Sequence, residues 1–528
     1  MYHIKIFIIV SITFFLSACS HKIPEASIHK QSSMTKLPER KAPLLDQLGK
    51  TDIKLEGRSA FYPLSAPTDA FAARLFLIDH ASTSLDVQYY IYKVDTTGKI
   101  FAAHLLMAAQ RGVKVRILLD DLSTTGKDDQ WQKLSSHPNI ELRLFNPNKL
   151  RTSFRNLALL FNVNSLGKRM HNKSLVADGS AAIIGGRNIG DVYFASRAKT
   201  LFLDYDILAI GKVVPEISEA FDLYWNSHES VPSEDILVKT DHDLSYLANK
   251  DELKRDLKTY EESSEGKAIL LSDFNRKIFQ DDLTFIVAKQ TDFYYDHPSK
   301  VSIDEQDNAT HISAQVKEEL LEVEKDLILI SPYFIPSDQM MQSLKKDRER
   351  GVNVTVITNS LASTDVFPVY SAYQNDIKAL VDMGVKLYEL KPDSFKKFLS
   401  ATEWANPNSL SLHTKMIILD NDRLAVGSAN IDPRSDKLNT EILMIISSKK
   451  LAEAERKEVD KVINLNNFYQ ISWGAYPNDF EGETTRYGPI WHTLQEGKEK
   501  TYYAPPHVGF WKRLGTDMLS ILPIKGYL

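Results

Sequence analysis

Cysteine is almost absent from this chain, since Cys19 is the only one among 528 residues. A single cysteine excludes an internal disulfide framework and any metal site built from several cysteines. A strong charge of one sign is also lacking, because 64 Lys and Arg residues are set against 69 Asp and Glu residues, for a net charge of −5. The chain therefore lacks the basic balance typical of nucleic-acid-binding proteins. Its composition, 43% hydrophobic and 25% charged, is globular, and its length allows more than one core.

The apolar run at the N-terminus, Ile6 to Leu16, is too short to span a bilayer. It follows Lys5 and precedes the letters LSAC at 16–19, an order typical of a signal peptide. The only cysteine stands where a bacterial lipobox places the cysteine that is acylated. We therefore expect residues 1–19 to be a lipoprotein signal peptide and Cys19 to be the lipid anchor. An ordinary signal peptide with an incidental cysteine is the alternative.

Residues 20–44 are polar, contain proline and show no periodicity, so we expect them to form a flexible tether. A chain anchored in this way would lie in the bacterial cell envelope and face the periplasm. Ser20 follows the cysteine, at the position where lipoproteins held in the inner membrane usually carry Asp. This favours the outer membrane over the inner one.

Beyond residue 44, strand and helix patterns alternate, which predicts an α/β fold with a largely parallel sheet. The same order of elements occurs twice. The letters RGV at 111–113 return at 350–352, 239 positions later (350 − 111). The strand pattern at 140–147 returns at 385–392, 245 positions later (385 − 140). This nearly constant spacing predicts an internal duplication of a domain-sized unit.

Two stretches at the same spacing carry an unusual set of polar residues. They are MHNKSLVADGSAAIIGGRN from 170 and LHTKMIILDNDRLAVGSAN from 412, and their histidines lie 242 positions apart (413 − 171). Residues i and i+2 of a strand face the same side, so His171 and Lys173 should point together, as should His413 and Lys415. Each half would thus present an imidazole and an ammonium group at one place.

Each stretch also ends in an asparagine, Asn188 or Asn430, whose amide can return beside the histidine. Two lysines and two amides can supply positive charge to a phosphodiester without a metal. One neutral His can attack phosphorus while the other, protonated, gives its proton to the leaving alkoxide. A carboxylate behind each His would orient its ring. Glu441 is the candidate in the second half, and Asp204, with Asp206 as a close second, is the candidate in the first.

Both stretches resemble the HKD motifs, HxKxxxxD with a trailing GSxN, of the phospholipase D superfamily. The resemblance implies an α/β chain with two duplicated phospholipase D-like mixed-sheet domains, packed about a pseudo-twofold axis with one shared active site. It also implies a phosphohistidine intermediate, with no metal and no other cofactor. The catalytic residues expected on this basis, including the carboxylates chosen above, are His171, Lys173, Asn188, His413, Lys415, Asn430, Asp204 and Glu441.

The remaining motif residues are expected to be structural. Asp178 and Asp420 lie an odd number of positions from their histidines, so their side chains should face away from the site. The small residues that precede each asparagine should allow close approach of the backbone; they are Gly185, Gly186, Gly427 and Ser428.

The duplication also suggests domain boundaries. The two phospholipase D-like domains are expected at 45–228 and 301–470. A charged segment at 229–300 is interpreted as linker and adornment, and 471–528 as a C-terminal tail. Within the tail, the apolar and basic residues of 510–522 predict either an interfacial helix or a terminal helix packed on its own domain.

Several short stretches resemble the bacterial cardiolipin synthases, in particular C-type lipoproteins: DVQYYIY at 86–92, SPYFIP at 331–336 and YELKP at 388–392. Tyr370 is a departure, because that group often has His there, which leaves its head-group contacts open. The resemblance implies transfer of a phosphatidyl group from phosphatidylglycerol or phosphatidylethanolamine to phosphatidylglycerol. A hydrolase that releases phosphatidic acid is the alternative, and a nuclease is a weaker one. The expected partners are membrane phospholipids, with no nucleic acid, and the sequence identifies no protein partner.

Overall fold

The computed structural model describes residues 30–35, 43–48, 55–124, 126–148, 167–194, 199–237, 250–302, 311–316, 322–394, 409–477, 485–522 and 525–527. The expected signal peptide, Cys19 and most of the expected tether lie outside the described residues. No helix in the part that is described is long and apolar enough to cross a membrane.

The N-terminal half is built on a nine-stranded sheet in the order β10-β1-β8-β6-β5-β2-β3-β4-β9. Its strands are β1 (Ser59–Leu64), β2 (Ser84–Tyr89), β3 (Lys114–Asp120), β4 (Ile140–Phe145), β5 (Ser174–Ala177), β6 (Ala181–Gly185), β8 (Asp206–Gly211), β9 (Ser230–Pro232) and β10 (Ile286–Val287). The main helices of this half are α3 (Pro67–His80), α4 (Thr96–Gln110), α5 (Asp128–Ser135), α8 (Asp191–Phe194), α9 (Val213–Asn226), α11 (Lys250–Glu261), α12 (Ser264–Leu270) and α13 (Asp273–Phe279).

The C-terminal half is built on a ten-stranded sheet in the order β11-β18-β17-β16-β12-β13-β14-β19-β20-β21. Its strands are β11 (Gln290–Tyr295), β12 (Asp326–Ile330), β13 (Asn353–Asn359), β14 (Lys386–Leu390), β16 (Met416–Leu419), β17 (Arg423–Gly427), β18 (Ile442–Ser447), β19 (Phe468–Pro477), β20 (Thr485–Gln495) and β21 (Lys498–Tyr502). The main helices are α16 (Asp338–Glu349), α17 (Phe367–Tyr373), α18 (Ile377–Asp382), α20 (Pro433–Lys437), α21 (Lys449–Val462) and α22 (Phe510–Ser520).

The two sheets confirm the predicted duplication. The order β1-β8-β6-β5-β2-β3-β4-β9 of the first sheet is matched position by position by β11-β18-β17-β16-β12-β13-β14-β19 in the second. The repeated letters RGV lie at the C-terminal end of a helix in each half. Gly112 follows α4 with φ +100° and Gly351 follows α16 with φ +91°, a left-handed conformation that glycine adopts without strain.

The sheets are mixed, as the resemblance implies, and the prediction of a largely parallel sheet is wrong. Within the two large sheets, parallel pairing is confined to β2, β3 and β4 and to their counterparts β12, β13 and β14. The strands that follow each His-Lys pair form antiparallel hairpins, β5 with β6 and β16 with β17. Only three residues join the strands of each hairpin, and a parallel crossover needs a much longer connection.

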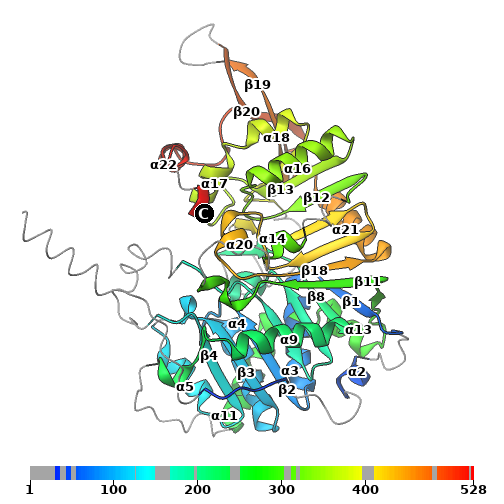
Figure 1. Cartoon of the computed structure of the whole chain (residues 1–528), viewed down its shortest axis with the longest axis vertical. Helices are drawn as coiled ribbons and strands as arrows, with labels where there is room; N and C mark the ends of the chain where they lie inside the picture. Colours follow the sequence, from blue (N-terminus) through cyan, green and yellow to red (C-terminus); the bar gives the residue numbers. More distant parts are fainter. Residues whose placement is uncertain are drawn as a thin grey trace, which may run out of the picture.

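The two halves share one apolar core (Figure 1). Val176 and Ile184 of the first sheet and Ile418 and Val426 of the second are buried in a single cluster, so one face of each sheet packs against the other. Separate clusters lie on the outer faces, under the helices of each half. A parallel two-stranded sheet, β7 (Thr200–Leu203) with β15 (Ser409–Leu412), also joins the halves.

The segment 229–300 is more than the expected linker. It supplies β9, β10 and three helices to the first half and β11 to the second. Ile269, Phe274 and Phe285 are buried in the core of the first half, which accounts for its attachment. The expected tail behaves similarly, because the hairpin β20-β21 extends the second sheet.

A short segment of the expected tether, Lys30–Thr35, is bound to the first half. The backbone N–H of Ser33 donates to Asn226 Oδ1 at 3.1 Å, and that of Thr35 donates to Asp222 Oδ2 at 3.0 Å. Arg116 donates to the carbonyl of Ser33 at 3.0 Å. We call residues 30–35 the strap.

Candidate active site

The two histidines are held by crossed backbone contacts between the halves. The N–H of His171 donates to the carbonyl of Thr440 at 2.9 Å, and the N–H of His413 donates to the carbonyl of Leu203 at 2.7 Å. Each histidine of one half is therefore joined to the residue that directly precedes a carboxylate of the other half. This reciprocal pairing relates the two histidines by the pseudo-twofold axis.

Those carboxylates orient the imidazole rings. Glu441 Oε1 and Oε2 each lie 2.9 Å from His171 Nδ1, and Asp204 Oδ2 lies 2.6 Å from His413 Nδ1. A carboxylate on Nδ1 leaves Nε2 of each ring for chemistry. Asp206, the close alternative to Asp204, instead pairs with Arg74 at 2.9 Å and Arg187 at 3.2 Å. The structure thus places Asp204, and not Asp206, beside His413.

The small residues of the motifs make room for these acids. A Cβ on Gly186 would lie 2.1 Å from Asp204 Oδ1, so only glycine admits the carboxylate at this position. At the equivalent position of the second half, Ser428 donates through its hydroxyl to Glu441. Ser435 at α20 donates to the other oxygen of Glu441 at 2.8 Å.

The neighbouring glycines are needed for strand packing. A Cβ on Gly185 would lie 2.2 Å from Asp206 Oδ1, and one on Gly427 would lie 2.1 Å from the carbonyl of Ile442. Both glycines end a hairpin strand where the adjacent strand begins. Close approach of the backbone accounts for glycine at both positions.

Lys173 and Lys415 are buried beside their histidines. Each ammonium donates to the backbone carbonyl of the histidine two residues earlier, His171 or His413. Burial lowers the pKa of Lys173 to about 7, and the nearby charge of Lys415 contributes to this shift. Burial also lowers the pKa of Lys415. The carboxylates of Glu441 and Asp204 oppose both shifts, and an anionic ligand would oppose them further.

The two asparagines differ in their contacts. Asn188 Oδ1 accepts from the N–H of Ile91 at 3.0 Å, and its amide donates to Tyr193 at 2.9 Å. Asn430 is held through its backbone N–H, which donates to Ser435 at 3.1 Å. Within the described residues, the buried Oδ1 of Asn430 makes no hydrogen bond.

Both histidines have lowered pKa values. Burial and the charges of Lys173 and Lys415 lower the pKa of His171 well below its ordinary value. Burial and Lys415 lower the pKa of His413 against the opposing effect of Asp204.

The two carboxylates shift in opposite directions. Burial raises the pKa of Glu441 above its ordinary value. Burial acts in the same sense on Asp204, but His413 and Lys415 outweigh it and lower the pKa of Asp204. Asp204 is therefore the more readily ionised of the two carboxylates.

Asp178 and Asp420 lie at the opposite ends of their strands from the site. Asp178 Oδ1 accepts from the N–H groups of Thr83 and Ser84 at 2.7 and 2.9 Å. Asp420 Oδ1 accepts from the N–H groups of Lys325 and Asp326 at 2.7 and 3.0 Å. Both carboxylates fasten the loop that leads into a parallel strand, β2 or β12.

Asp120 and Asn359 are site residues that our sequence analysis missed. Asp120 Oδ2 accepts from the N–H of Met170 at 2.9 Å, and Asn359 Oδ1 accepts from the N–H of Leu412 at 2.8 Å. Each thus holds the residue directly before a catalytic histidine. They end the equivalent strands β3 and β13 and lie 239 positions apart (359 − 120), the spacing of the repeated RGV. A comparison of polar residues at this spacing could have found them.

Aromatic rings that the sequence did not single out enclose the histidines. Tyr90 meets His171 edge-on at a centroid distance of 4.9 Å, and Tyr193 meets His413 in the same manner at 5.2 Å. Phe202 stacks on His413 at 5.1 Å. The rings restrict the orientation of both imidazoles and remove them from water.

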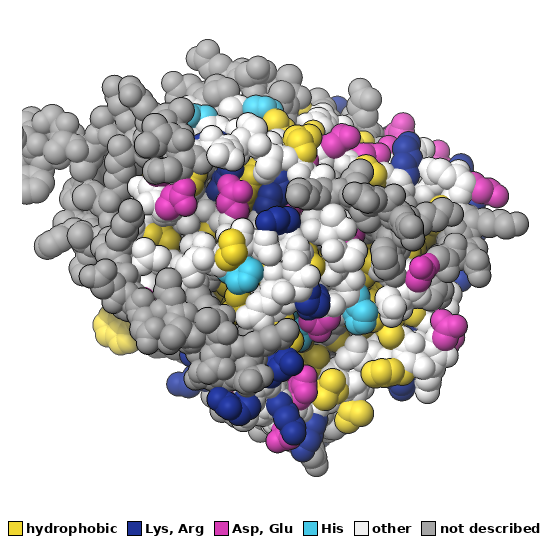
Figure 2. Space-filling view, turned by 90° about the horizontal axis from the view of Figure 1, so that it is seen from below, with side chains coloured by type: hydrophobic (Ala, Val, Ile, Leu, Met, Phe, Trp, Pro, Cys, Tyr) yellow, Lys and Arg dark blue, Asp and Glu magenta, His cyan; other side chains and the backbone are white. Residues whose placement is uncertain are grey.

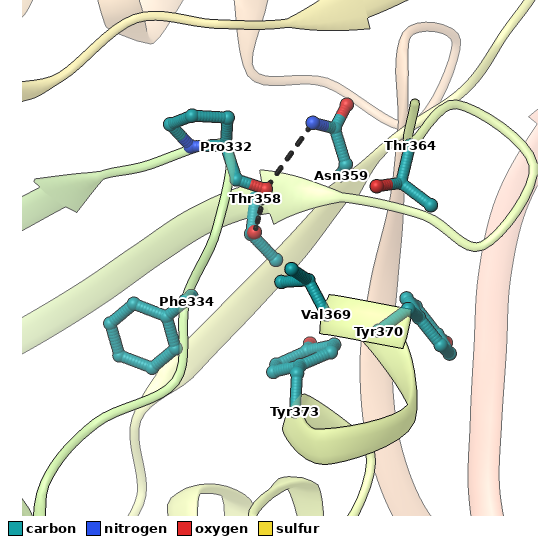
Figure 3. A pocket seen from close by; sticks show the side chains of 8 residues that line it. All are labelled: Pro332, Phe334, Thr358, Asn359, Thr364, Val369, Tyr370 and Tyr373. Atoms are coloured by element: carbon teal, nitrogen blue, oxygen red, sulfur yellow. Dashed lines mark hydrogen bonds between the residues drawn. The ribbon is translucent and has the colours of Figure 1, made fainter. Parts of the chain in front are cut away.

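A small pocket lies next to Asn359 in the second half (Figure 3). Its lining residues are Pro332, Phe334, Thr358, Asn359, Thr364, Val369, Tyr370 and Tyr373. The hydroxyl of Tyr370 donates at 3.1 Å to Glu389, which is fully buried and also accepts from Trp491 at 2.9 Å. Burial raises the pKa of Glu389 to about 7. The polar end of Tyr370 is thus engaged with a core carboxylate.

Among the described residues, no group of three or more His, Cys, Asp or Glu side chains is arranged to hold a metal ion.

Comparisons with known proteins indicate one family. The family model described as "Cardiolipin synthase, PLD-like domain" matches residues 75–225 and 316–463, one match in each half. The chain is 36% identical to cardiolipin synthase C of Escherichia coli, over 89% of this chain and 97% of that protein. It is 33% identical to an uncharacterized protein of Helicobacter pylori, over 98% and 99%.

Among solved structures, phosphatidylserine synthase of Haemophilus influenzae has a similar fold. The TM-score is 0.53 at 13% identity, over 82% of this chain and 92% of that chain. The two-half architecture, the paired histidines and these matches lead to one conclusion. The chain belongs to the family of the PLD-like domain of cardiolipin synthases, in the phospholipase D superfamily.

Proposed function

We propose that the protein is a phosphatidyltransferase that makes cardiolipin. It moves a phosphatidyl group from phosphatidylglycerol or phosphatidylethanolamine to a histidine, and then to the glycerol hydroxyl of phosphatidylglycerol. The observation that carries the proposal is the pair of crossed His–carboxylate contacts, His171 with Glu441 and His413 with Asp204. They supply a nucleophile and an acid to one phosphodiester. The identity of 36% to a cardiolipin synthase supports the choice of lipid.

The two histidines have different roles in this proposal. His171, whose pKa lies well below its ordinary value, is neutral and attacks phosphorus through Nε2. The N–P bond forms as the P–O bond to the donor head group breaks. Burial also lowers the pKa of His413, but the ionised Asp204 opposes this shift, and His413 as an imidazolium gives its Nε2 proton to the departing oxygen. The anionic phosphodiester adds negative charge and so supports this protonation state.

The second step is the first step in reverse, with the acceptor hydroxyl in place of the donor head group. The acceptor hydroxyl loses its proton to His413 and attacks phosphorus, and the N–P bond to His171 breaks. In this mechanism the positive charge of Lys173 and Lys415 and the amide groups of Asn188 and Asn430 stabilise the phosphoryl oxygens in the transition state. In this mechanism water must be kept from the phosphohistidine while the acceptor is held near it.

Product analysis tests the proposal. Membranes that contain phosphatidylglycerol should yield cardiolipin as the main product, because a positioned acceptor reaches an effective concentration on the order of 10⁵ M. High glycerol should reverse the reaction. The products are separated by thin-layer chromatography and identified by mass spectrometry. If phosphatidic acid dominates at every level of phosphatidylglycerol, the protein is a hydrolase instead.

A nuclease is the remaining alternative, and it predicts cleavage of single-stranded DNA at a comparable rate. On the face shown in Figure 2, Lys and Arg side chains are interspersed with Asp and Glu and do not form a basic stripe. The near balance of charges in the whole chain agrees with this.

The same reaction should be insensitive to chelators. The proposed charge stabilisation comes from lysine and asparagine side chains, so EDTA should leave the rate of cardiolipin formation unchanged. Loss of activity with EDTA and its recovery with one particular ion would contradict this mechanism.

We further propose that Cys19 is acylated and holds the protein at the outer membrane, facing the periplasm. The lone cysteine at the end of a signal-peptide pattern supports this. A clickable fatty acid should label the wild type, and Cys19→Ala should give an unlabelled, unprocessed precursor. Equal label in both chains would disprove the anchor.

A further inference from the structure

The helix α22 and the two residues after it expose an unusual number of apolar side chains. Thirteen large hydrophobic side chains of the described residues are exposed, and six of them lie within these thirteen positions. Trp511 is 80% exposed, Met518 64% and Ile521 84%. The other three are Phe510, Leu514 and Leu522.

The polar side of this helix, and not the apolar side, is attached to the protein. Lys512 Nζ donates to the carbonyl of Leu361 at 2.7 Å, and Thr516 is fully buried. At the end of the helix, the carbonyl of Ser520 accepts from Asn375 at 3.0 Å. A surface helix usually buries its apolar stripe and exposes its polar one. The reversed orientation of α22 holds an apolar face outward on a fixed support.

The helix lies on the outside of the C-terminal half (Figure 1). It packs on α17 and is bonded to Leu361, two residues beyond Asn359, which holds the residue before His413. The terminal turn η5 (Lys525–Tyr527) contacts α20. Ser435 of α20 donates to Glu441, the partner of His171. Short connections thus link the exposed face to both histidines.

We propose that the apolar face of Phe510–Leu522 inserts into the lipid bilayer and brings the active site to the membrane surface. The choice of a bilayer rests on the proposed function, because the phosphodiester substrate is then itself a membrane component. The composition agrees with this occupant. Phe and Trp side chains, next to the basic residues Lys512 and Arg513, are typical of interfacial helices. A second copy of the chain or a protein partner would bury the same face, and the experiment separates these cases.

A local probe tests the insertion in the full-length chain. In a Cys19→Ala background, Met518→Cys places a nitroxide spin label on the apolar face. Lys258→Cys, on the exposed surface of α11, is the matched control. With vesicles of phosphatidylglycerol and phosphatidylethanolamine, the label at 518 should become more accessible to oxygen and less accessible to a water-soluble nickel complex. The label at 258 should not change.

Two results would overturn the proposal. One is a label at 518 that stays equally accessible to the nickel complex when vesicles are added. The other is protection from both reagents that grows with protein concentration in the absence of vesicles, which would indicate that a second copy covers the face. The label reports insertion without catalysis. Insertion without cardiolipin formation would therefore reject only the proposed function, and cardiolipin formation without insertion only this inference.

A paired activity measurement addresses the purpose of insertion. Trp511→Ser with Met518→Ser should lower turnover on vesicles by roughly ten- to a hundredfold, the loss expected for two apolar side chains withdrawn from lipid. Turnover of a short-chain phosphatidylglycerol below its micelle concentration should not change. Both side chains are exposed, so the variant should melt at the wild-type temperature. An equal loss on both substrates would contradict a membrane role.

Discussion

Gly186 and Ser428 occupy equivalent positions in the two halves but support the neighbouring acid in different ways. In the second half, the hydroxyl of Ser428 secures the longer side chain of Glu441. In the first half, the shorter Asp204 has to come closer, and Gly186 leaves it the space. The Gly-Gly and Gly-Ser pairs of the two motifs are thus matched to the length of the acid that each one supports.

This difference predicts that Gly186→Ala lowers kcat strongly. The added methyl would displace Asp204 and tilt His413, and a misplacement of about 1 Å costs on the order of 10²-fold in rate. Gly515→Ala, at a helical position where a Cβ meets open space, is the control and should keep full activity. Steady-state kinetics and thermal unfolding of both variants decide the matter. Normal kcat in Gly186→Ala would show that Asp204 tolerates displacement.

Proton uptake on ligand binding is expected from Lys173. Its pKa is about 7 in the free protein, below the ordinary 10.5, so at pH 8 the amine is mostly neutral. A bound phosphodiester anion favours the ammonium and raises this pKa, so binding at pH 8 should draw a proton from the buffer. Below about pH 6, where the amine is already charged, this uptake should vanish.

Calorimetry with glycerophosphoglycerol, a soluble diester, in two buffers of different ionisation enthalpy measures the uptake. Lys173→Met should reduce it. Binding at pH 8 with the same apparent enthalpy in both buffers would mean that the lysine is already charged.

Much of the site could be predicted at the residue scale, and one part could not. Each lysine lies beside its histidine as predicted, although both pairs lie just before β5 and β16 and not within these strands. The crossing of the acids was not foreseen, because Glu441 and His171 are 270 positions apart and meet only when the two sheets pack together. No local pattern in a sequence reports which half an acid serves.

At the scale of elements, the ends of β3 and β13 position the catalytic histidines. Asn359 bonds both backbone groups of Leu412, through Oδ1 to its N–H at 2.8 Å and through Nδ2 to its carbonyl at 2.9 Å. Neither asparagine nor aspartate at a strand end is unusual in itself. Only the comparison of the two halves shows that Asp120 and Asn359 occupy equivalent positions and bind the residue before each histidine.

We expect Asn359→Ala to lower kcat by about tenfold or more with little change in KM. Two buried hydrogen bonds are lost, each contributing about 1 kcal/mol to the position of the segment before His413. Asn353→Ala is a matched control, because Asn353 lies exposed at the other end of the same strand. Equal effects of the two variants on kcat would rule out a positioning role for Asn359.

Asp420 should affect stability and not chemistry. Burial would raise its pKa, but N–H donors of Asp326, Glu324 and Lys325 lower it below 3.8. A depressed pKa means that the carboxylate stabilises the fold above pH 3.8, and that this contribution is lost as pH falls through the folded pKa. Asp420→Asn should therefore lower the free energy of unfolding at pH 7, while kcat stays normal. The difference from the wild type should shrink as the pH falls below 3.8.

Elements were predictable where local patterns decide them. The RGV repeat marked the ends of two helices because glycine in a left-handed conformation is a local requirement. The direction of the later strands could not be predicted in the same way. The alternation of strands and helices indicates parallel pairing, but in the first sheet only β2, β3 and β4 pair in parallel. The charged composition of segment 229–300 indicates linker and adornment, and it does not reveal the few apolar residues that join the core.

At the scale of the whole molecule, the active site belongs to one chain and needs both halves. His171→Ala and His413→Ala should each lower turnover by at least about 10²-fold, and the double variant should be little worse, because residues that act as one unit are not additive.

A mixture of the two single variants should stay inactive, because each chain still lacks one histidine of its only site. Cardiolipin formation in the mixture is the measurement. Recovery of activity on mixing would show that halves of different chains combine into one site.

The bound strap limits how far the enzyme can move from its anchor. Only eleven peptide steps separate Cys19 from Lys30 (30 − 19), whose ammonium donates to the carbonyl of Ser230 at 2.8 Å. A fully extended chain covers at most about 3.6 Å per residue, so an acylated Cys19 would confine Lys30 to within about 40 Å of the lipid surface. With so short an anchoring segment, the enzyme would encounter donor and acceptor lipids by diffusion in the plane of the membrane. Its rate of encounter with substrate would then depend on the number of phosphatidylglycerol molecules per unit area of membrane. A longer segment between Cys19 and Lys30 would enlarge the volume accessible to the enzyme and should slow the reaction in proportion to that volume.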